Sequence, residues 1–230
     1  MNQQFQITKR NESEFVISYL VLRRAVGILG IALPLVLLID FFFLKQGCTL
    51  PPSISHYYYT SFGTYFTGTL CAVALFLYSY NGPEAMDNRA ALFAAVCALG
   101  VAFIPANCYC ENCDTCIRVH LDNSPFRNGI HYALAGLLFL TLAYFCLYLF
   151  TKTSPAGPTN EKRTRNLIYK VCGITILTCI IFIPIFDFTP VGKLPVIKDF
   201  KLWTFVFEAL ALFAFGFSWL IKGETFFKDK

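Results

Sequence analysis

The sequence is poor in charge for a chain of 230 residues. Only 14% of the residues are Asp, Glu, Lys or Arg, whereas 56% are hydrophobic and the mean hydropathy is +0.56. A water-soluble core cannot enclose that much apolar surface, but a lipid bilayer can cover it. The low charge therefore argues against a soluble enzyme or a soluble binding domain.

The sequence also lacks the common motifs of catalysis and nucleotide binding. It contains no HExxH, no GxSxG and no glycine-rich phosphate loop. The net charge is +5, but the basic residues are scattered and no soluble fold carries them. We therefore expect membrane lipids as partners and no nucleic acid.

Long apolar runs are the main positive feature of the chain. A bilayer core about 30 Å thick needs about 20 apolar residues in a helix, and a segment in lipid must satisfy its own backbone hydrogen bonds. The pattern predicts an all-α, polytopic integral membrane six-helix bundle. The expected spans are residues 25–44, 63–80, 90–106, 129–150, 167–186 and 202–221.

The spans define three segments. We expect a cytoplasmic N-terminal segment at 1–24, the transmembrane domain at 25–222 and a cytoplasmic tail at 223–230. The first run has full length and no Ala-x-Ala-like exit, which indicates a signal anchor. Asn11 and Glu14 could form a capping box that begins a short interfacial helix. A simple extension of the first span is the alternative.

The distribution of Lys and Arg predicts the orientation. Six spans place both termini on one side, and that side carries thirteen of the 19 basic residues. Positive residues favour the cytoplasmic side, so both termini are expected to be cytoplasmic. The turn at 81–89, with Glu84 and Asp87, is then cytoplasmic and expected to be solvated. The expected location is the plasma or inner membrane, or an endomembrane in a eukaryotic cell.

Polar residues that could form a site fall on the predicted outward side. All three histidines of the chain, His56, His120 and His131, lie there. Two acids, Asp40 and Glu208, interrupt apolar runs in the outer half of the bilayer. Glu208 is about 10 Å below the interface, where an unpaired charge costs about 2.5–3.5 kcal/mol.

These residues predict an outward-facing polar pocket. Asp40, His131 and Glu208 would converge within the bundle, and His56 would close the pocket from the loop above. Histidine titrates near neutral pH, so a His–carboxylate pair there could act as a general base. The alternative is structural, with each polar group satisfied separately by its own neighbours.

Four cysteines lie within nine residues, in the sequence CYCENCDTC. The predicted topology places this segment outside, where disulfides are permitted. One or two disulfides among the four are expected, with the pairing open. A zinc site that also uses His120 is one alternative, and free thiols are another. The cysteines are Cys108, Cys110, Cys113 and Cys116.

The order of short motifs resembles a known superfamily over residues 25–150. The outward loop contains PPSIS at 51–55, the second span ends in YSYNG, the third begins at NRAAL, and the fourth opens with IHYALAGLLF at 130–139. This order is similar to the six-span superfamily of DRAM-type autophagy modulators, Sfk-type membrane proteins and GPI-anchor remodelling proteins, including its bacterial relatives of unknown function. The resemblance implies a role in lipid handling or membrane organisation.

The resemblance also adds residues to the predicted pocket. Ser53, together with Ser55, matches the serine-containing loop motif of that superfamily, and His131 matches its helix-four histidine. The pocket candidates are therefore Asp40, Ser53, His56, His131 and Glu208.

Three functions remain open at this point. The first is lipid handling or membrane organisation without classical catalysis. The second is a membrane hydrolase or acyltransferase that uses His131 and His56 with Glu208 or Asp40. The third is a small proton-coupled transporter or channel subunit, with Glu208 as the coupling site. No cofactor is firmly indicated, although zinc is possible in the cysteine segment.

Overall fold

The computed structural model describes residues 2–44, 50–108, 117–153, 157–194 and 202–226, and these residues form a bundle of helices. The long helices are α1 (Asn2–Ile39), α2 (Gly63–Tyr78), α3 (Ala85–Phe103), α4 (Pro125–Tyr144), α5 (Asn160–Phe188) and α7 (Trp203–Lys222). Two π-helical segments extend α1 and α4: η1 (Asp40–Leu44) and η3 (Phe145–Leu149). Two short 3-10 helices, η2 (Ile54–Tyr59) and η4 (Pro190–Lys193), lie in loops.

The helices have the character of a multi-pass membrane protein. Five of those described are long and apolar enough to cross a bilayer, whereas α2 has only 16 residues. Large apolar side chains are exposed on outer faces; Val96 of α3 is 57% exposed and Ile174 of α5 is 59% exposed. Lipid would cover such side chains. The all-α bundle is confirmed. That α2 also spans the membrane, which would give six spans, and the orientation of the termini stay predictions.

Local capping signals set helix starts that differ from the ends of the apolar runs. The Ser124 hydroxyl accepts a hydrogen bond from the backbone N–H of Arg127, and Pro125 occupies the first helical position of α4. The Thr159 hydroxyl caps α5 through the N–H of Lys162. Both helices therefore begin several residues before the expected starts at 129 and 167.

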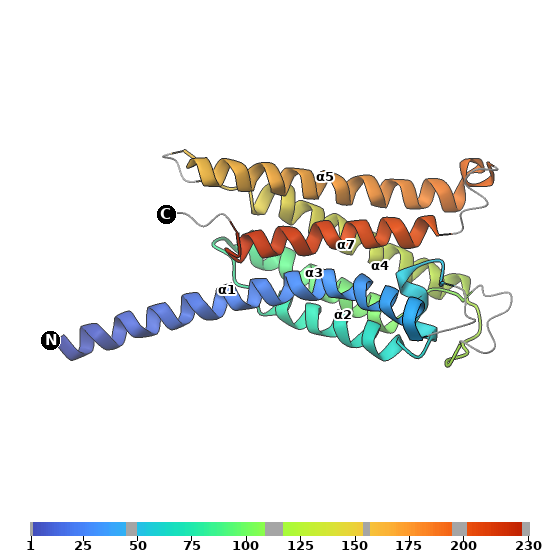
Figure 1. Ribbon diagram of the computed structural model, residues 1–230, viewed down its shortest axis with the longest axis horizontal. Helices are drawn as coiled ribbons and strands as arrows, with labels where there is room; N and C mark the ends of the chain where they lie inside the picture. The colour runs from blue at the N-terminus through green and yellow to red at the C-terminus, as the bar shows by residue number, and fades with distance from the viewer. Residues whose placement is uncertain (1, 45–49, 109–116, 154–156, 195–201, 227–230) are drawn as a thin grey trace.

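The N-terminal part of α1 continues without a break through Asn11 and Glu14. This continuity agrees with a simple extension of the first span and not with a separate helix that begins at Asn11. In Figure 1 this part of α1 projects beyond the other helices at the end of the bundle where α7 also ends.

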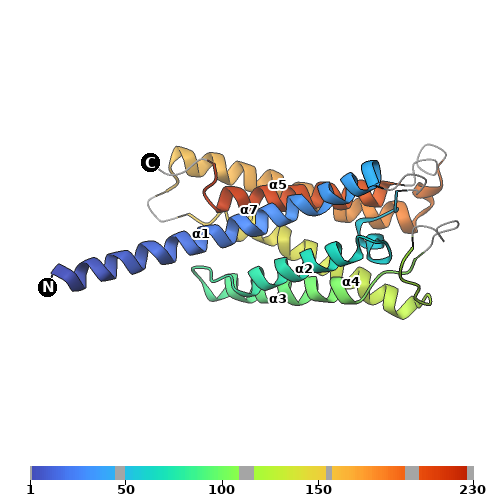
Figure 2. The same cartoon turned by 60° about the horizontal axis from the view of Figure 1, so that its bottom comes forward.

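The six long helices pack in a closed ring that follows the order of the chain. Each helix contacts the next one, and α7 contacts both α5 and α1. Figures 1 and 2 show α1 and α7 side by side, with α2 and α3 on one side of them and α5 on the other. The first and last helices therefore close the ring.

Small residues permit this closure. A Cβ atom added at Gly216 of α7 would lie 2.6 Å from the carbonyl oxygen of Gly27 of α1, and one added at Gly27 would lie 2.7 Å from the carbonyl oxygen of Gly216. A Cβ at Gly30 would lie 2.8 Å from the ring of Phe215. The two backbones can approach this closely only because these positions carry no side chain.

Aromatic rings fill the ring of helices at the end where α7 finishes. The ring of Trp219 lies 5.2–5.6 Å, between centroids, from the rings of Tyr80, Phe145 and Phe150. All four side chains are at most 4% exposed. Aromatic packing therefore closes this end, whereas the opposite end is closed by the loop described below.

One sequence prediction about this end is wrong. The Asp87 side chain is buried, 1% exposed, whereas the sequence suggested a solvated turn. Its Oδ2 accepts the N–H of Glu84 at 2.9 Å, and its Oδ1 lies 3.3 Å from Nζ of Lys152. Lys152 comes from the loop after α4, so nothing near Asp87 in the sequence revealed its partner.

The close contact between α1 and α7 predicts that a Gly→Ala substitution lowers stability within the contact and does not lower it elsewhere. Gly216→Ala places a methyl group against the Gly27 carbonyl, which should lower stability by about 1–3 kcal/mol because the helices must separate. Gly68→Ala, in α2 where no atom lies within 4 Å, should be neutral or stabilising by up to about 1 kcal/mol. Thermal unfolding in detergent measures both; equal melting temperatures would contradict the prediction.

Candidate functional site

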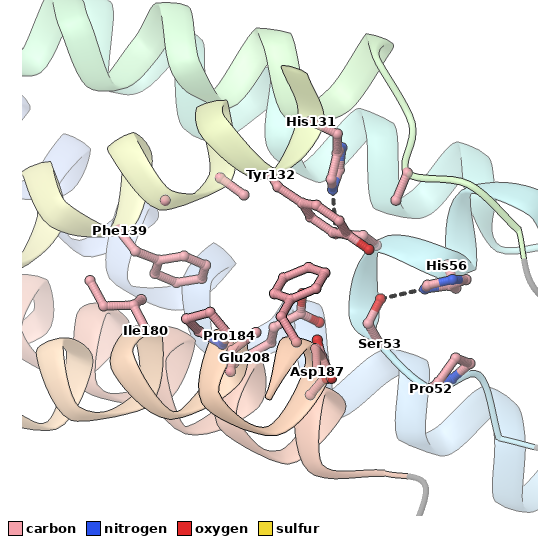
Figure 3. A pocket seen from close by; sticks show the side chains of 17 residues that line it. Pro52, Ser53, His56, His131, Tyr132, Phe139, Ile180, Pro184, Asp187 and Glu208 are labelled. Carbon is pink, nitrogen blue, oxygen red and sulfur yellow. Dashed lines mark hydrogen bonds between the residues drawn. The ribbon is translucent and has the colours of Figure 1, made fainter. Parts of the chain in front are cut away.

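A cavity of about 450 Å³ lies among α4, α5 and α7, beneath the loop that contains η2. Its wall has two chemically distinct parts. The polar part is formed by Ser53, Ser55, His56, His131, Asp187, Thr204 and Glu208. The apolar part includes Ala135, Gly136, Phe139, Ile180, Ile183 and Pro184. Figure 3 shows Phe139 and Ile180 on one side of the cavity and Ser53 and His56 on the other.

The polar part depends on a loop that is inserted into the end of the bundle. Within η2, Ile54, Tyr57 and Tyr59 are buried together with Ser55. The Tyr57 hydroxyl donates to the carbonyl oxygen of Leu37 in α1 at 2.8 Å. The Tyr59 hydroxyl donates to the carbonyl oxygen of Ala106, just after α3, at 2.5 Å. The two tyrosines therefore fix the loop to α1 and to the residues that follow α3.

Glu208 fixes the same loop from α7. Its Oε2 accepts the backbone N–H of Ile54 at 2.6 Å, and the N–H of Phe205, one turn earlier, donates to the carbonyl oxygen of Pro52 at 2.9 Å. A buried N–H group needs an acceptor, and a carboxylate is a strong one. This contact gives a structural reason for an acid within an apolar helix.

His131 of α4 is held on both ring nitrogens. Its Nδ1 lies 2.6 Å from the carbonyl oxygen of Ile104, and its Nε2 lies 3.1 Å from the Ser55 hydroxyl. A carbonyl only accepts, so Nδ1 carries the proton, and Nε2 of the neutral ring accepts the Ser55 O–H. The pair thus has the geometry in which a histidine can take a proton from a serine.

His56 forms a second Ser–His pair in the loop. Its Nδ1 lies 2.5 Å from the Ser53 hydroxyl. The pKa of His56 is lowered to about 4, mainly by burial and in smaller part by the neighbouring His131, and a hydrogen bond with the backbone of Asn107 partly opposes the shift. His56 is therefore neutral at physiological pH and can accept or donate a hydrogen bond.

Asp187 supplies a second carboxylate to the wall. It lies in the last turn of α5, and both its oxygens accept from the Thr204 hydroxyl of α7, at 3.0 and 3.1 Å. The hydrogen bonds found for the two carboxylates therefore go to Thr204 and to the backbone of Ile54. Each histidine instead pairs with a serine.

The structure brings four of the five predicted pocket residues to one cavity: Ser53, His56, His131 and Glu208. Asp40 does not line it. Asp40 is buried, 1% exposed, where α1 passes into η1. Its apolar surroundings in the sequence showed that it is unusual, but they did not show which face of the helix carries it.

Three residues of the polar part of the wall were not among those predicted: Ser55, Asp187 and Thr204. Ser55 was noted only as a neighbour of Ser53 in the loop motif, and the 3-10 turn directs it toward His131 while Ser53 contacts His56. Asp187 and Thr204 were assigned to a loop and to a span, respectively. The only available signal for Asp187 was its position one residue beyond a predicted span, because α5 in fact continues to Phe188.

The structure describes only part of the cysteine segment. Cys110, Cys113 and Cys116 lie outside the described residues, and no described cysteine is joined to another in a disulfide. His120 is exposed and away from the cavity. Within the described ranges, no three His, Cys, Asp or Glu side chains are arranged to hold a metal. The disulfide and zinc interpretations of Cys108–Cys116 therefore stay predictions.

Two substitutions at Glu208 separate its acceptor role from its charge. Glu208→Gln keeps an oxygen for the Ile54 N–H and should retain most of the stability. Glu208→Ala leaves that buried N–H without its acceptor and should lower the free energy of unfolding by about 1–3 kcal/mol. Thermal unfolding in detergent tests this. If Glu208→Ala is as stable as Glu208→Gln, the carboxylate does not hold the loop.

The lowered pKa of His56 predicts an acid-sensitive fold. Between pH 6.5 and about 4 the unfolded chain binds a proton at His56 that the folded chain does not. The contribution of His56 to the free energy of unfolding is therefore fully present above pH 6.5, and it is lost as the pH falls from 6.5 to about 4. His56→Gln should flatten the decline of the melting temperature, whereas His120→Gln, at an exposed site, should follow the wild type. An identical decline in all three proteins would contradict the prediction.

Comparison with known proteins adds no assignment. The chain matches no family model, and neither a curated protein nor a solved structure is similar to it. The resemblance to the six-span superfamily therefore stays a prediction.

Proposed function

We propose that the protein is a lipid-handling membrane protein that holds one lipid in the cavity among α4, α5 and α7. The observation that carries this proposal is the division of the cavity wall. Hydroxyl, imidazole and carboxyl groups occupy one part and aliphatic and aromatic side chains occupy the other. A lipid is the common membrane component with the same division.

The cavity has a suitable size and position. Its volume of about 450 Å³ lies within the range of about 300–1,000 Å³ for sites of small molecules. That is enough for a small polar group and the adjoining part of an acyl chain. The apolar part is formed by α4 and α5, two helices with the length and hydropathy of membrane spans.

The polar groups could bind the ester or hydroxyl oxygens of a lipid. Ser53 and Ser55 each contact a neutral histidine, and Thr204 contacts Asp187, so hydroxyl and imidazole groups are already oriented by their neighbours. Oriented groups lose less conformational freedom when a ligand binds. In the predicted topology this polar part faces outward, near the lipid head groups.

The Ser55–His131 pair supports one second candidate, a hydrolase or acyltransferase. The Ile104 carbonyl fixes the protonated nitrogen of His131, and the other nitrogen is directed at the Ser55 hydroxyl. This serine could attack an ester if His131 accepts its proton. A backbone carbonyl occupies the place that a carboxylate has in a catalytic triad, so the alternative does not require Glu208 or Asp40 at this histidine.

The lipid proposal is tested by filling the cavity. Gly136 of α4 lines the cavity, and a Cβ atom added there meets no atom within 4 Å. Gly136→Leu should therefore displace the lipid and lower lipid retained after mild detergent purification at least fivefold, because the added side chain takes its volume. Native mass spectrometry measures the retained lipid.

Gly129→Leu is the matched control. Gly129 lies on the same helix in equally open space but outside the cavity, so this variant should retain lipid as the wild type does. Loss of lipid from both variants, or from neither, would refute the proposed site. Appearance of lyso-lipid or free fatty acid with the wild type, but not with Gly136→Leu, would favour the enzyme candidate.

A further inference from the structure

Two carboxylates share one side of the lipid cavity. Asp187 is in the last turn of α5, and its two oxygens accept from the Thr204 hydroxyl of α7 at 3.0 and 3.1 Å. Glu208 lies one turn after Thr204, so these two residues are on the same face of α7. Asp187, Thr204 and Glu208 all line the cavity. In Figure 3 the two carboxylates lie below, and His131 lies above them.

Each carboxylate is hydrogen-bonded to a neutral donor. The donor to Asp187 is the Thr204 hydroxyl, and the donor to Glu208 is the backbone N–H of Ile54, at 2.6 Å from Oε2. A neutral donor satisfies an oxygen atom, but it does not cancel a negative charge. In addition, Thr204 has one hydroxyl proton for the two Asp187 oxygens, so Asp187 can accept further hydrogen bonds. A cation in the cavity would be attracted by both acids, more strongly than in water.

Two aromatic side chains line the cavity near these acids. Phe188 follows Asp187 in α5, and its ring lies 5.8 Å, between centroids, from the ring of Tyr132 of α4. The face of an aromatic ring attracts a cation, and the ring also excludes water from it. The apolar part of the wall, which includes Phe139 and Ile180, suits a hydrocarbon chain. The cavity therefore combines a region that attracts positive charge with an apolar region.

Hydroxyl groups distinguish this wall further. Ser53 and Ser55 line the cavity from the loop, and Thr204 lines it from α7. A hydroxyl oxygen has two lone pairs, so each of these side chains can accept a hydrogen bond from a hydroxyl group of a ligand. A phosphate close to the bound cation would instead be repelled by Asp187 and Glu208, because like charges oppose each other.

We propose that the lipid held in this cavity carries a protonated amine and hydroxyl groups but no phosphate. This inference rests on the proposed function, because it names the class of lipid for that site. The amine binds to Asp187 and Glu208 and lies beside the aromatic rings. The hydroxyl groups of the lipid bind to the hydroxyl groups of the wall, and its chain lies against the apolar part.

The test compares three lipids that share one chain and differ at the polar end. Sphingosine has a free amine, N-acetylsphingosine has a neutral amide in its place, and sphingosine 1-phosphate keeps the amine and adds a phosphate. Each is titrated against the full-length protein in non-ionic detergent, and native mass spectrometry measures the fraction of protein with bound lipid. Sphingosine should bind about tenfold more tightly than either other lipid, because it alone gains the charge-assisted contacts without repulsion.

Substitutions assign the selectivity to the two carboxylates. Asp187→Asn and Glu208→Gln each keep a hydrogen-bond acceptor but remove a negative charge. Each should weaken sphingosine binding about tenfold and leave N-acetylsphingosine binding unchanged, and this unchanged binding shows that the variant is folded. Asp122→Asn is the control; it removes an exposed carboxylate away from the cavity and should bind all three lipids as the wild type does.

The outcomes separate this inference from the proposed function. Equal affinity for sphingosine and N-acetylsphingosine, tighter binding of sphingosine 1-phosphate, or equal weakening by all three substitutions would overturn the amine. If lipid is still lost from Gly136→Leu in that case, the lipid cavity itself stands. Retention of lipid by Gly136→Leu would instead refute the proposed function, and the amine inference with it.

Discussion

The hydrogen bond from the Ile54 N–H to the Glu208 carboxylate is the contact on which the candidate site depends. The loop that carries Ser53, Ser55 and His56 lies within the end of a helical bundle, where its backbone cannot rely on water. Glu208, Tyr57 and Tyr59 connect that backbone or its side chains to three different walls. In the loop fixed in this way, Ser53 contacts His56 and Ser55 contacts His131.

The position of the lipid cavity follows from the closed ring of helices. Aromatic side chains fill one end of the ring and the inserted loop fills the other, so the polar residues gather near the two ends. The lipid cavity lies below the loop. The apolar faces between these ends are exposed and suit contact with acyl chains.

Apolar runs predicted the helices well, because hydrophobic length is a property of each segment alone. Helix ends were less predictable, since capping by Ser124 and Thr159 extends helices beyond the apolar runs. In the site, the apolar runs correctly predicted that His131 and Glu208 lie near the same end of the bundle, where both line one cavity. The pairing of Ser55 with His131, the absence of Asp40 from the wall and the burial of Asp87 depend on contacts between distant segments, which no local pattern contains.

The contact between Gly27 and Gly216 has a consequence for the order of assembly. These residues come from α1 and α7, so the ring can close only after α7 has been synthesised. Glu208 is on α7 as well. Until α7 joins the bundle, the loop lacks its carboxylate acceptor and the lipid cavity lacks the wall formed by Thr204 and Glu208. The cavity is therefore complete only after α7 has packed against α1 and α5, and a nascent chain that lacks α7 does not have it.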